Sequence, residues 1–386
     1  MLRLPTVQPD RFAITHMLVH IVTDNFDTGG GIEHIFQIVQ GLPQLDFRIF
    51  AEAGDATDRF SGLRNVETCP HGYSPALVLK PKPDLIHIHQ LRPLLAFFLN
   101  PLAKYEVPVI YTAHGLHLHK YEFPLNVLNR LKYKLRFALE KYLFARADQI
   151  IAVSKEDQNF IKTRYKSNHV SYIPNGIDHS RLDAARPQKM EIENEFRLPA
   201  KRTLFITVAR FNFQKGYDVL IRAIALIKDF LTERNARFLL VGDGDTLPEI
   251  KKMSEQLKIT HLVRFLGTRT DAYILMKSAD VLLLPSRWEG LPIVLLEAGL
   301  LKIPVIASAT YGNRELLGQD RGVMFENENA SDLAEKIKGT LCGEYKLSHL
   351  ADNFFKEIKM NYSVAQMLAG LQGTYLSTVS GKSGNQ

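Results

Sequence analysis

The sequence contains little of what marks secreted, membrane-spanning or disulfide-bonded proteins. Only two cysteines occur among 386 residues, Cys69 and Cys342, and they lie too far apart for any usual metal-ligand spacing. This scarcity indicates a reducing compartment and excludes a disulfide framework. The first residues lack the apolar stretch of a signal peptide, and no run approaches the roughly 20 apolar residues of a membrane helix. We therefore expect a cytoplasmic protein.

The sequence has no large excess of charge of one sign. The formal net charge is +7, and the 46% hydrophobic and 23% charged residues are typical of soluble globular proteins. This charge favours an anionic partner such as a phosphate, a nucleotide or an acidic membrane surface, without choosing among them. We expect no nucleic-acid partner. The length fits two domains better than one core.

The chain does contain a regular alternation of short β-branched runs with amphipathic segments, which is typical of βαβ units and parallel sheets. The first series of expected strands is "HMLVHIVTD", "FRIFAE", "DLIHIHQ", "VPVIYTAHG", "DQIIAVS" and "VSYIPNGID". A polar, linker-like stretch from His179 to Arg202 follows, and the pattern restarts with "TLFITVAR", a helix over "GYDVLIRAIALIKDFL", "ARFLLVGDGD", "VRFLG", "DVLLLPS" and "PVIAS". Two such series predict two doubly wound α/β domains with a ligand-binding cleft between them.

Two glutamates, Glu289 and Glu297, bracket an apolar segment in "SRWEGLPIVLLEAG". Pro292 fits the first turn of a helix over 293–300, whose free N–H groups and dipole would form an anion site. Glu297 would lie roughly 7.5 Å along that helix, so the two carboxylates cannot share one small atom. The spacing therefore favours a carboxylate on either side of a bound anion over a hydrolytic dyad. The plain alternative is a helix cap and a surface charge.

Two cations, Arg210 and Lys215, follow the first strand of the second series in "VARFNFQKG". Arginine chelates phosphate and lysine adds a point charge. Either residue alone is more often a solvated surface residue. Together with the helix N-terminus they predict a diphosphate pocket.

Two glycine-rich turns also follow expected strands. "TGGGIE" would bring the backbone N–H groups of 29–31 near a phosphate or a sugar. In "VGDGD" the third glycine of a dinucleotide fingerprint is missing, and we favour a close-approach turn against a base or a ribose. The alternative, a divalent metal held by Asp243 and Asp245, is less favoured.

Histidines are frequent in the first half of the chain. A metal site there is conceivable, but no carboxylate or cysteine has ligand spacing beside them. His114 ends an expected strand, and we favour a polar contact with substrate. The others, His87, His89, His117 and His119, are interpreted as structural.

Residues 126–146 form an expected helix that is basic on one face. Apolar residues recur at helical spacing (Leu128, Leu131, Leu135, Ala138, Leu139 and Tyr142), and the basic residues lie largely elsewhere (Arg130, Lys132, Lys134, Arg136 and Lys141). The favoured interpretation is a helix packed on its sheet through the leucines, with a solvated basic face. The alternative is contact with anionic lipid or a lipid-linked acceptor.

These motifs occur in an order that resembles the family-4 retaining glycosyltransferases (glycosyl transferases group 1) of the GT-B fold. The motifs are the "GGG" turn, "DLIHIH", "TAHG", "IIAVS", "IPNGID", "VARFNFQKG", "LLVGDGD", "FLGTRTD", "SRWEGLPIVLLEA" and "PVIAS". The resemblance implies a retaining hexosyltransferase that moves a sugar from a nucleotide donor, such as a UDP-sugar, to an acceptor hydroxyl. It implies no metal for the chemistry, and we expect no other cofactor.

The acceptor expected from this resemblance is a glycan or a lipid-linked molecule of cell-envelope polysaccharide or glycolipid synthesis. Peripheral contact with the inner face of an anionic membrane would accompany it. The implied domains are 1–184, which faces the acceptor and is completed by a C-terminal helix within 362–386, and 185–361, which binds the donor.

The resemblance also implies roles for single residues. Arg210 and Lys215 would bind the diphosphate, Glu297 the ribose, Glu289 the donor-sugar hydroxyls, and His114 the donor sugar near its reacting carbon. The backbone of Gly290, Leu291, Pro292 and Ile293 would line the sugar and phosphates. Gly242, Arg269 and Thr270 would lie near the base, and Gly30 and Gly31 near the distal phosphate.

Two segments depart from the family pattern, and rival functions stay open. "VARF" replaces the commoner Val-Gly-Arg-Leu and keeps the arginine, and "ATYGNRELL" keeps only Gly312 where a Gly-Gly pair is usual, although Glu315 is placed as expected. A GT-B sugar-nucleotide epimerase is disfavoured by "EGLP", and a glycoside phosphorylase by the lack of a recognisable pyridoxal-lysine segment. The rival from another class is a non-catalytic subunit that binds nucleotide sugars.

Overall fold

The computed structural model describes residues 17–27, 29–99, 105–122, 126–180, 189–196 and 202–383. Much of the expected linker, at 181–188 and 197–201, therefore lies outside the described residues. Every predicted site residue lies inside them.

The first sheet has seven strands in the order β3-β2-β1-β4-β5-β6-β7. Its strands are β1 Leu18–Asn25, β2 Asp46–Glu52, β3 Val66–Cys69, β4 Leu85–His89, β5 Val109–Ala113, β6 Gln149–Ala152 and β7 Val170–Tyr172. The order reverses beside β1, which pairs in parallel with both β2 and β4. This reversal is the mark of a doubly wound sheet.

Helices connect these strands, as parallel pairing requires. They are α1 Gly30–Gly41, η1 Thr57–Phe60, α2 Pro75–Val78, α3 Leu91–Phe98, η2 His117–Glu122, α4 Val127–Phe144, α5 Lys155–Phe160 and η3 Ile161–Tyr165. The short α7, Lys189–Glu195, follows β7.

The second sheet has six strands in the order β10-β9-β8-β11-β12-β13, and all of its pairs are parallel. Its strands are β8 Thr203–Val208, β9 Ala236–Val241, β10 Val263–Gly267, β11 Val281–Leu284, β12 Val305–Ser308 and β13 Val323–Phe325. Its helices are η4 Phe213–Lys215, α8 Tyr217–Leu226, α9 Lys228–Glu233, α10 Leu247–Gln256, α11 Ala272–Ser278, α12 Ile293–Leu300, α13 Tyr311–Leu317, α14 Ala330–Leu341, α15 Leu347–Asn361 and α16 Val364–Ser383.

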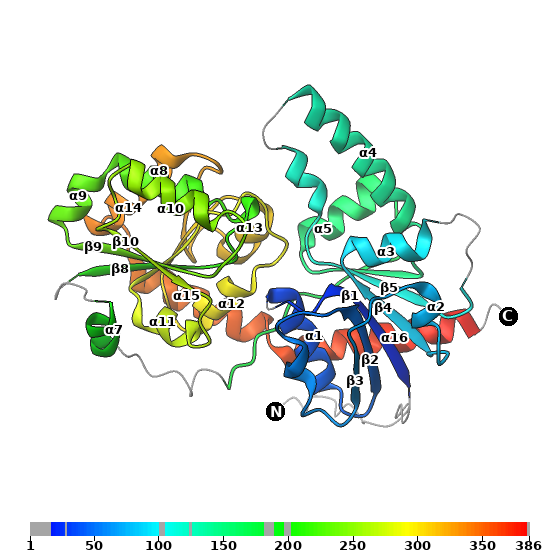
Figure 1. The fold of residues 1–386 in the computed structure, drawn as a ribbon. Coiled ribbons are helices and arrows are strands. Elements are labelled where there is room, and N and C mark those ends of the chain that lie inside the picture. The colour runs from blue at the N-terminus through cyan, green and yellow to red at the C-terminus, as the bar shows by residue number, and fades with distance from the viewer. Residues whose placement is uncertain are drawn as a thin grey trace, which may run out of the picture. The chain divides into compact units, whose positions relative to one another are not determined.

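Apolar cores cover both faces of the second sheet. Helices α8, α10 and α14 pack on one face, and α11, α12 and α15 pack on the other (Figure 1). Buried on both sides, β11 is the uninterrupted apolar run Val281–Leu284, as expected for a central parallel strand. The predicted α/β class with two Rossmann-like parallel sheets is confirmed.

The chain divides into two compact units. The first contains the described residues up to Thr112, residues 146–149, and the chain from Gln372 onward. The second contains residues 113–145 and 150–371. Helix α16 contributes residues to both units.

Two expectations about helices are corrected. The helix predicted over "GYDVLIRAIALIKDFL" divides into α8 and α9, because Ile227 between them has a non-helical backbone with φ −124°. Three of the α4 leucines that were predicted to pack on the sheet do not: Leu128, Leu131 and Leu135 are 59, 55 and 64% exposed. The buried residues of α4 are Glu140, Leu143 and Phe144 instead.

No helix within the described ranges combines the length and the apolar character that crossing a bilayer requires.

Candidate functional site

The predicted site residues of the second unit follow the carboxyl ends of its strands. Arg210 lies two residues after β8, Gly242 directly after β9, Arg269 two residues after β10, and Glu289 five residues after β11. In parallel sheets this edge is where ligands bind. The site therefore depends on how the loops at this edge are held together.

An ion pair connects two of these loops. The Lys215 Nζ donates to Oε1 of Glu289 over 2.6 Å, although the two residues are 74 positions apart. The Glu289 side chain is 6% exposed and that of Lys215 is 20% exposed. A largely buried carboxylate is costly without such a cation. The two residues predicted to bind sugar and diphosphate thus balance each other's charge directly.

Lys215 is positioned by its own turn. The side chain of Asn212 caps η4 by accepting the backbone N–H of Lys215 at 3.2 Å. The next residue, Gly216, has a left-handed backbone with φ 63°, and a Cβ there would lie 2.1 Å from the carbonyl oxygen of Pro285. Only glycine tolerates both conditions without strain. Gly216 therefore lets the turn of Lys215 rest against the strand end that leads to Glu289.

Backbone hydrogen bonds join the same two loops. Gln214 donates its side-chain amide to the carbonyl of Trp288 at 2.8 Å and accepts the N–H of Arg287 at 2.7 Å through its own carbonyl. These bonds hold the residues next to Lys215 beside those next to Glu289. The ion pair is thus built on a fixed backbone.

Arg287 is a structural residue that the sequence did not reveal. Its side chain is 3% exposed, stacks on Phe213 with 4.0 Å between guanidinium and ring centre, and pairs with Asp218 and Glu328. Burial opposes ionisation of Asp218, but the hydrogen bonds and charges of Arg287 and Arg222 outweigh it and lower the pKa of Asp218. In the sequence, Arg287 looks like a loop residue at a strand end, and nothing marks it as buried.

Three glycines bring two loops and the start of helix α13 into backbone contact. A Cβ on Gly290 would lie 2.8 Å from the carbonyl of His114, and a Cβ on Gly312 would lie 1.8 Å from the carbonyl oxygen of Gly290. Gly115, with φ 109°, lies against the N–H of Gly290, 3.0 Å from an added Cβ. The loop of half-buried His114 therefore contacts the loop that carries Glu289. The glycine that this chain retains at 312 is the one in contact with Gly290.

The helix predicted over 293–300 is confirmed as α12, but Pro292 does not lie in its first turn. Pro292 is the N-cap residue, with an extended backbone of φ −70° and ψ 121°. Within the described chain no side chain caps this end, so the first N–H groups of α12 can bind an anion. The preceding carbonyl, of Leu291, accepts the buried Asn175 amide at 2.8 Å. Glu297 lies half-buried within α12.

The residues predicted near the base have structural contacts of their own. Arg269 forms a two-point ion pair with Asp271, at 2.8 Å for each bond, and a third bond to Glu195 at 2.9 Å. The hydrogen bonds with Asp271 raise the pKa of Arg269. Gly242 has φ 133°, and a Cβ there would lie 2.1 Å from the carbonyl of Ala209. These contacts explain Arg269 and Gly242 without a ligand, and Thr270 is exposed beside them.

Arg210 is held between two anchored neighbours. The N–H of Ala209 donates to the carbonyl of Val241 at 3.1 Å, and that of Phe211 donates to the carbonyl of Asp243 at 2.8 Å. Phe211 also stacks on Tyr217, with 3.8 Å between ring centres. The backbone at Arg210 is therefore fixed, while its side chain reaches the surface.

Gly30 and Gly31 belong to the first unit and form the first turn of α1. Within the described residues no side chain caps this helix. Their N–H groups are thus presented at a helix N-terminus, as the sequence predicted. In the same unit His87 bonds Tyr375 and Thr112, both at 2.7 Å, which confirms its interpretation as structural.

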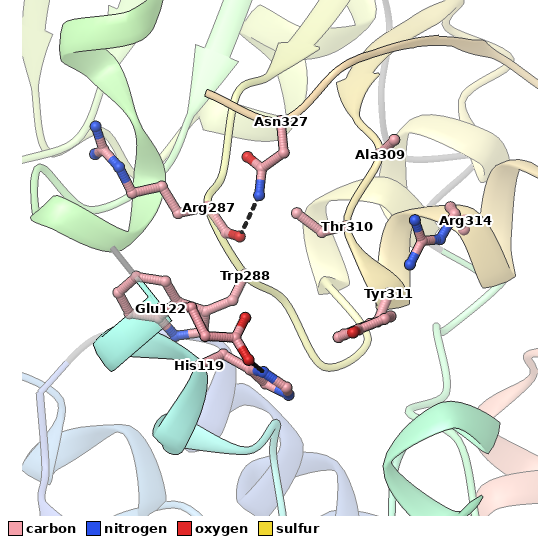
Figure 2. A pocket seen from close by; sticks show the side chains of 9 residues that line it. All are labelled: His119, Glu122, Arg287, Trp288, Ala309, Thr310, Tyr311, Arg314 and Asn327. Atoms are coloured by element: carbon pink, nitrogen blue, oxygen red, sulfur yellow. Dashed lines mark hydrogen bonds and ion pairs between the residues drawn. The ribbon is translucent and has the colours of Figure 1, made fainter. Parts of the chain in front are cut away.

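The second unit contains a pocket of about 180 Å³ (Figure 2). Two of its lining residues, Arg287 and Trp288, directly precede Glu289 in the sequence. His119 and Glu122 of η2 bond each other at 3.1 Å on one side of the pocket. Tyr311, the residue before Gly312, lies with its ring centre 5.2 Å from that of His119. The remaining lining residues are Arg287, Trp288, Ala309, Thr310, Arg314 and Asn327.

Comparisons with known proteins match the chain in two adjoining parts. The model described as Glycosyltransferase Family 4 matches residues 28–181, and the model described as Glycosyl transferases group 1 matches residues 188–356. Together they span most of the chain.

Individual relatives and structures agree with these models. TuaC of Bacillus subtilis, a glycosyltransferase named for teichuronic acid biosynthesis, is 25% identical over 76% of this chain and 70% of its own. An Escherichia coli UDP-Gal:alpha-D-GlcNAc-diphosphoundecaprenol alpha-1,3-galactosyltransferase is 26% identical over 79% of this chain and 78% of its own. Three other curated glycosyltransferases match over 44, 44 and 56% of their lengths.

Among solved structures, HepE of Anabaena in complex with UDP-glucose superposes with a TM-score of 0.79 and 21% identity. This match covers 94% of this chain and all of that one. At this identity the superposition establishes the fold alone. The two matched family models show that the chain belongs to the family-4 glycosyltransferases, and the superposition agrees with their GT-B fold.

Proposed function

We propose that this glycosyltransferase moves a sugar from a UDP-sugar to an acceptor hydroxyl with retention of configuration. The observation that carries the proposal is the Lys215–Glu289 ion pair, held next to the uncapped N-terminus of α12. A cation and helix N–H groups suit a diphosphate, and an adjacent carboxylate suits sugar hydroxyls. The choice of UDP is supported by the UDP-glucose bound to HepE and by the UDP-Gal in the name of the E. coli relative.

The leaving diphosphate would be stabilised by fixed charges. Negative charge grows on the diphosphate as its bond to the sugar breaks, and Arg210, Lys215 and the α12 N-terminus would face it. Preorganised groups of this kind each contribute about 10²–10³ in rate. The proposed reaction needs no metal, because these groups supply the positive charge.

The remaining roles would divide along the nucleotide sugar. Glu297 would bind the ribose hydroxyls, Glu289 the sugar hydroxyls, and His114 the sugar near its reacting carbon. The contact between the loops of His114 and Gly290 supports this placement, because it brings His114 beside the glutamate loop. In the proposed division of labour, residues 185–361 bind the donor, while 1–184 with the helix in 362–386 face the acceptor.

We assign the acceptor to cell-envelope glycan synthesis. The support comes from the names of two relatives: one is named for teichuronic acid biosynthesis, and the other for a sugar linked to diphosphoundecaprenol. A lipid-linked acceptor would require the enzyme to work at a membrane surface, and the chain has a helix suited to that.

Helix α4 exposes an apolar stripe to solvent. Leu128, Leu131, Leu135, Ala138 and Tyr142 recur at intervals of three and four residues, which places them on one helical face. All five are exposed, and Val127 at the start of the helix is 83% exposed. A soluble helix normally buries such a stripe.

Basic residues border the stripe. Arg130, Lys134 and Lys141 lie along one edge and Lys132 along the other, and all four are exposed. An apolar stripe with basic borders fits the interface of an anionic bilayer, with the helix lying in the membrane plane. We therefore include peripheral docking of α4 on anionic lipid, at the inner face of the cytoplasmic membrane, in the proposal.

Sedimentation with vesicles tests the docking. A Leu131→Ser/Leu135→Ser variant should bind vesicles of three parts phosphatidylcholine to one part phosphatidylglycerol at least tenfold more weakly than the parent, since burying a leucine contributes about 1.5–3 kcal/mol. Leu226→Ser removes a leucine of similar exposure, 60%, from α8 and should bind like the parent. Equal binding by all three proteins would remove α4 from the proposal.

Product stereochemistry tests the transfer. The parent should release UDP slowly from at least one UDP-sugar, and proton NMR of the sugar freed by transfer to water or to an added acceptor should show the donor's anomeric configuration first. Arg210→Ala and Glu289→Ala should each be at least a hundredfold slower. An inverted first product would refute retention, while tight binding without release, even with acceptor extracts, would favour a non-catalytic binding subunit.

A further inference from the structure

Three buried polar atoms in the lining of the Figure 2 pocket lack a hydrogen-bond partner among the described residues. They are the indole N–H of Trp288, the hydroxyl of Thr310 and the amide oxygen of Asn327. Trp288 is 7% exposed and Thr310 is 5% exposed, so bulk water does not satisfy them. Buried polar groups are normally paired, and leaving one unpaired costs about 1–3 kcal/mol. A ligand with several hydroxyl groups would satisfy both donors and acceptors.

The charged side chains around the pocket already have partners. Glu122 is bonded to His119 at 3.1 Å, and Arg314 lies 3.9 Å from Glu156 and over the ring of Tyr311. Arg287, the buried cation of the lining, is paired with Asp218 at 2.8 Å and with Glu328. Because this buried charge is already paired, the buried wall favours a neutral ligand over a phosphate or a carboxylate.

The shape and the aromatic wall limit the ligand further. The rings of Tyr311 and His119 lie side by side and offer an apolar surface for the C–H face of a ring. A volume of about 180 Å³ equals about six water molecules. It is below the roughly 300 Å³ at which sites for whole drug-sized ligands begin. The pocket therefore fits one sugar ring and excludes a complete nucleotide sugar.

We propose that this pocket binds a single neutral pyranose ring, with Tyr311 as the residue that creates its apolar wall. The inference rests on the proposed sugar transfer, and it adds a set of sugar contacts that includes neither Glu289 nor His114, the residues already assigned to the donor sugar. Tyr311 occupies a position where the resemblance implies a glycine, so the wall is a feature of this chain's own sequence. The ring is that of an acceptor or that of the donor.

Trp288 provides a direct readout, because it is the chain's single tryptophan and its indole lines the pocket. Methyl glycosides of common hexoses and N-acetylhexosamines should change the tryptophan emission in a saturable way at millimolar concentrations for at least one sugar. Tyr311→Gly should weaken that binding at least tenfold, whereas Tyr311→Phe, which keeps the ring, should bind within threefold of the parent. A titration unchanged in Tyr311→Gly, or no response to any methyl glycoside, would overturn the proposal.

Two competition experiments determine whether the bound ring is that of the acceptor or that of the donor. If saturating UDP leaves methyl glycoside binding intact and a non-transferable UDP-sugar also leaves it intact, the pocket belongs to the acceptor. If the UDP-sugar blocks it and UDP alone does not, the pocket holds the donor's sugar. Affinity for radiolabelled UDP should match between the parent and Tyr311→Gly. If the parent does not bind UDP, the proposed transfer is refuted. The comparison of the Tyr311 variants would still decide whether the pocket binds a glycoside.

Discussion

The ion pair between Lys215 and Glu289 leads to a prediction about stability as well as binding. Breaking a buried pair by removing one partner costs about 3–5 kcal/mol, because the other charge stays buried and unpaired. The Glu289 side chain is 6% exposed, but Lys215 is 20% exposed, so water reaches part of the pair. For Lys215→Met we therefore expect the free energy of unfolding to fall by about 2–3 kcal/mol.

The second half of this prediction concerns coupling. Glu289→Gln leaves a neutral amide beside Lys215 and should cost less than Lys215→Met. The double variant should lose at least about 1 kcal/mol less than the sum of the two single variants. Urea unfolding at neutral pH measures all four free energies. Lys82→Met, which breaks an exposed pair with Glu106 at 2.7 Å, is the control and should cost at most about 0.5 kcal/mol.

Binding separates the stabilising role of the pair from its proposed role toward the donor. Lys215→Met should weaken UDP binding at least tenfold, since a charge-assisted hydrogen bond contributes about 1.5–3 kcal/mol. Glu289→Gln should leave the affinity for UDP unchanged or raise it, because Lys215 would not have to break an ion pair with a carboxylate before it binds the diphosphate. Additive losses in stability, or equal weakening of UDP binding by both variants, would refute the reasoning from a shared buried pair.

Three further perturbations test other parts of the second unit. Gly312→Ala would place a Cβ 1.8 Å from a backbone carbonyl oxygen, so we expect the rate of UDP release from a UDP-sugar to fall at least tenfold, whereas Gly373→Ala, which meets no atom within 4 Å, should leave this rate unchanged. Burial raises the pKa of Asp157 to about 7, above its value in the unfolded chain, so the contribution of this carboxyl to stability is fully present below about pH 4 and is lost as the pH rises toward about 7. Urea unfolding across this range should show a smaller decrease for Asp157→Asn, and equal slopes would contradict the assignment. Asn175→Ala removes a buried hydrogen bond of 2.8 Å to a backbone carbonyl and should lower the unfolding free energy by about 1–3 kcal/mol, and an unchanged melting temperature in calorimetry would contradict this.

Much of the fold could be predicted because central parallel strands are buried on both faces. β11 is an uninterrupted apolar run of this kind, and β8, β9 and β12 each contain three or four consecutive apolar residues, by which they could be predicted. The strands that were missed, β3 and β13, are three or four residues long and lie at sheet edges. Apolar periodicity needs a longer segment than that to be recognised.

Sequence periodicity also identifies an apolar face without telling what covers it. The leucines of α4 have the spacing of a core-facing stripe, which led to the prediction that they pack on the sheet. In the structure Leu131 and Leu135 are exposed, and the helix packs through Leu143 and Phe144 near its end. The helix was predicted correctly, but the surface expected to cover its apolar face was wrong. The spacing of apolar residues identifies a face of a helix and does not identify what that face packs against.

The positions of the candidate site residues at strand ends could be predicted from the sequence, but their contacts could not. Arg210, Lys215 and Glu289 were found because they follow strand ends, where ligands bind in parallel sheets. That Lys215 reaches Glu289 depends on Gln214, Arg287 and the left-handed Gly216, which hold two distant loops together. Such long-range packing of loops leaves no periodic signal in the sequence.

The glycine contacts distinguish a tightly packed part of the backbone from the neighbouring side chain of Tyr311, which lines the pocket. At Gly115, Gly290 and Gly312 the backbones of two loops and the start of helix α13 touch, and a Cβ at any of them would lie within 3.0 Å of a neighbouring backbone atom. These positions therefore hold the glutamate loop in place and leave no space for a side chain. Tyr311, one residue away, directs its ring toward His119 in the pocket (Figure 2). Because the backbone beside Tyr311 is fixed, we expect substitutions at Tyr311 to change the wall of the pocket without moving Glu289.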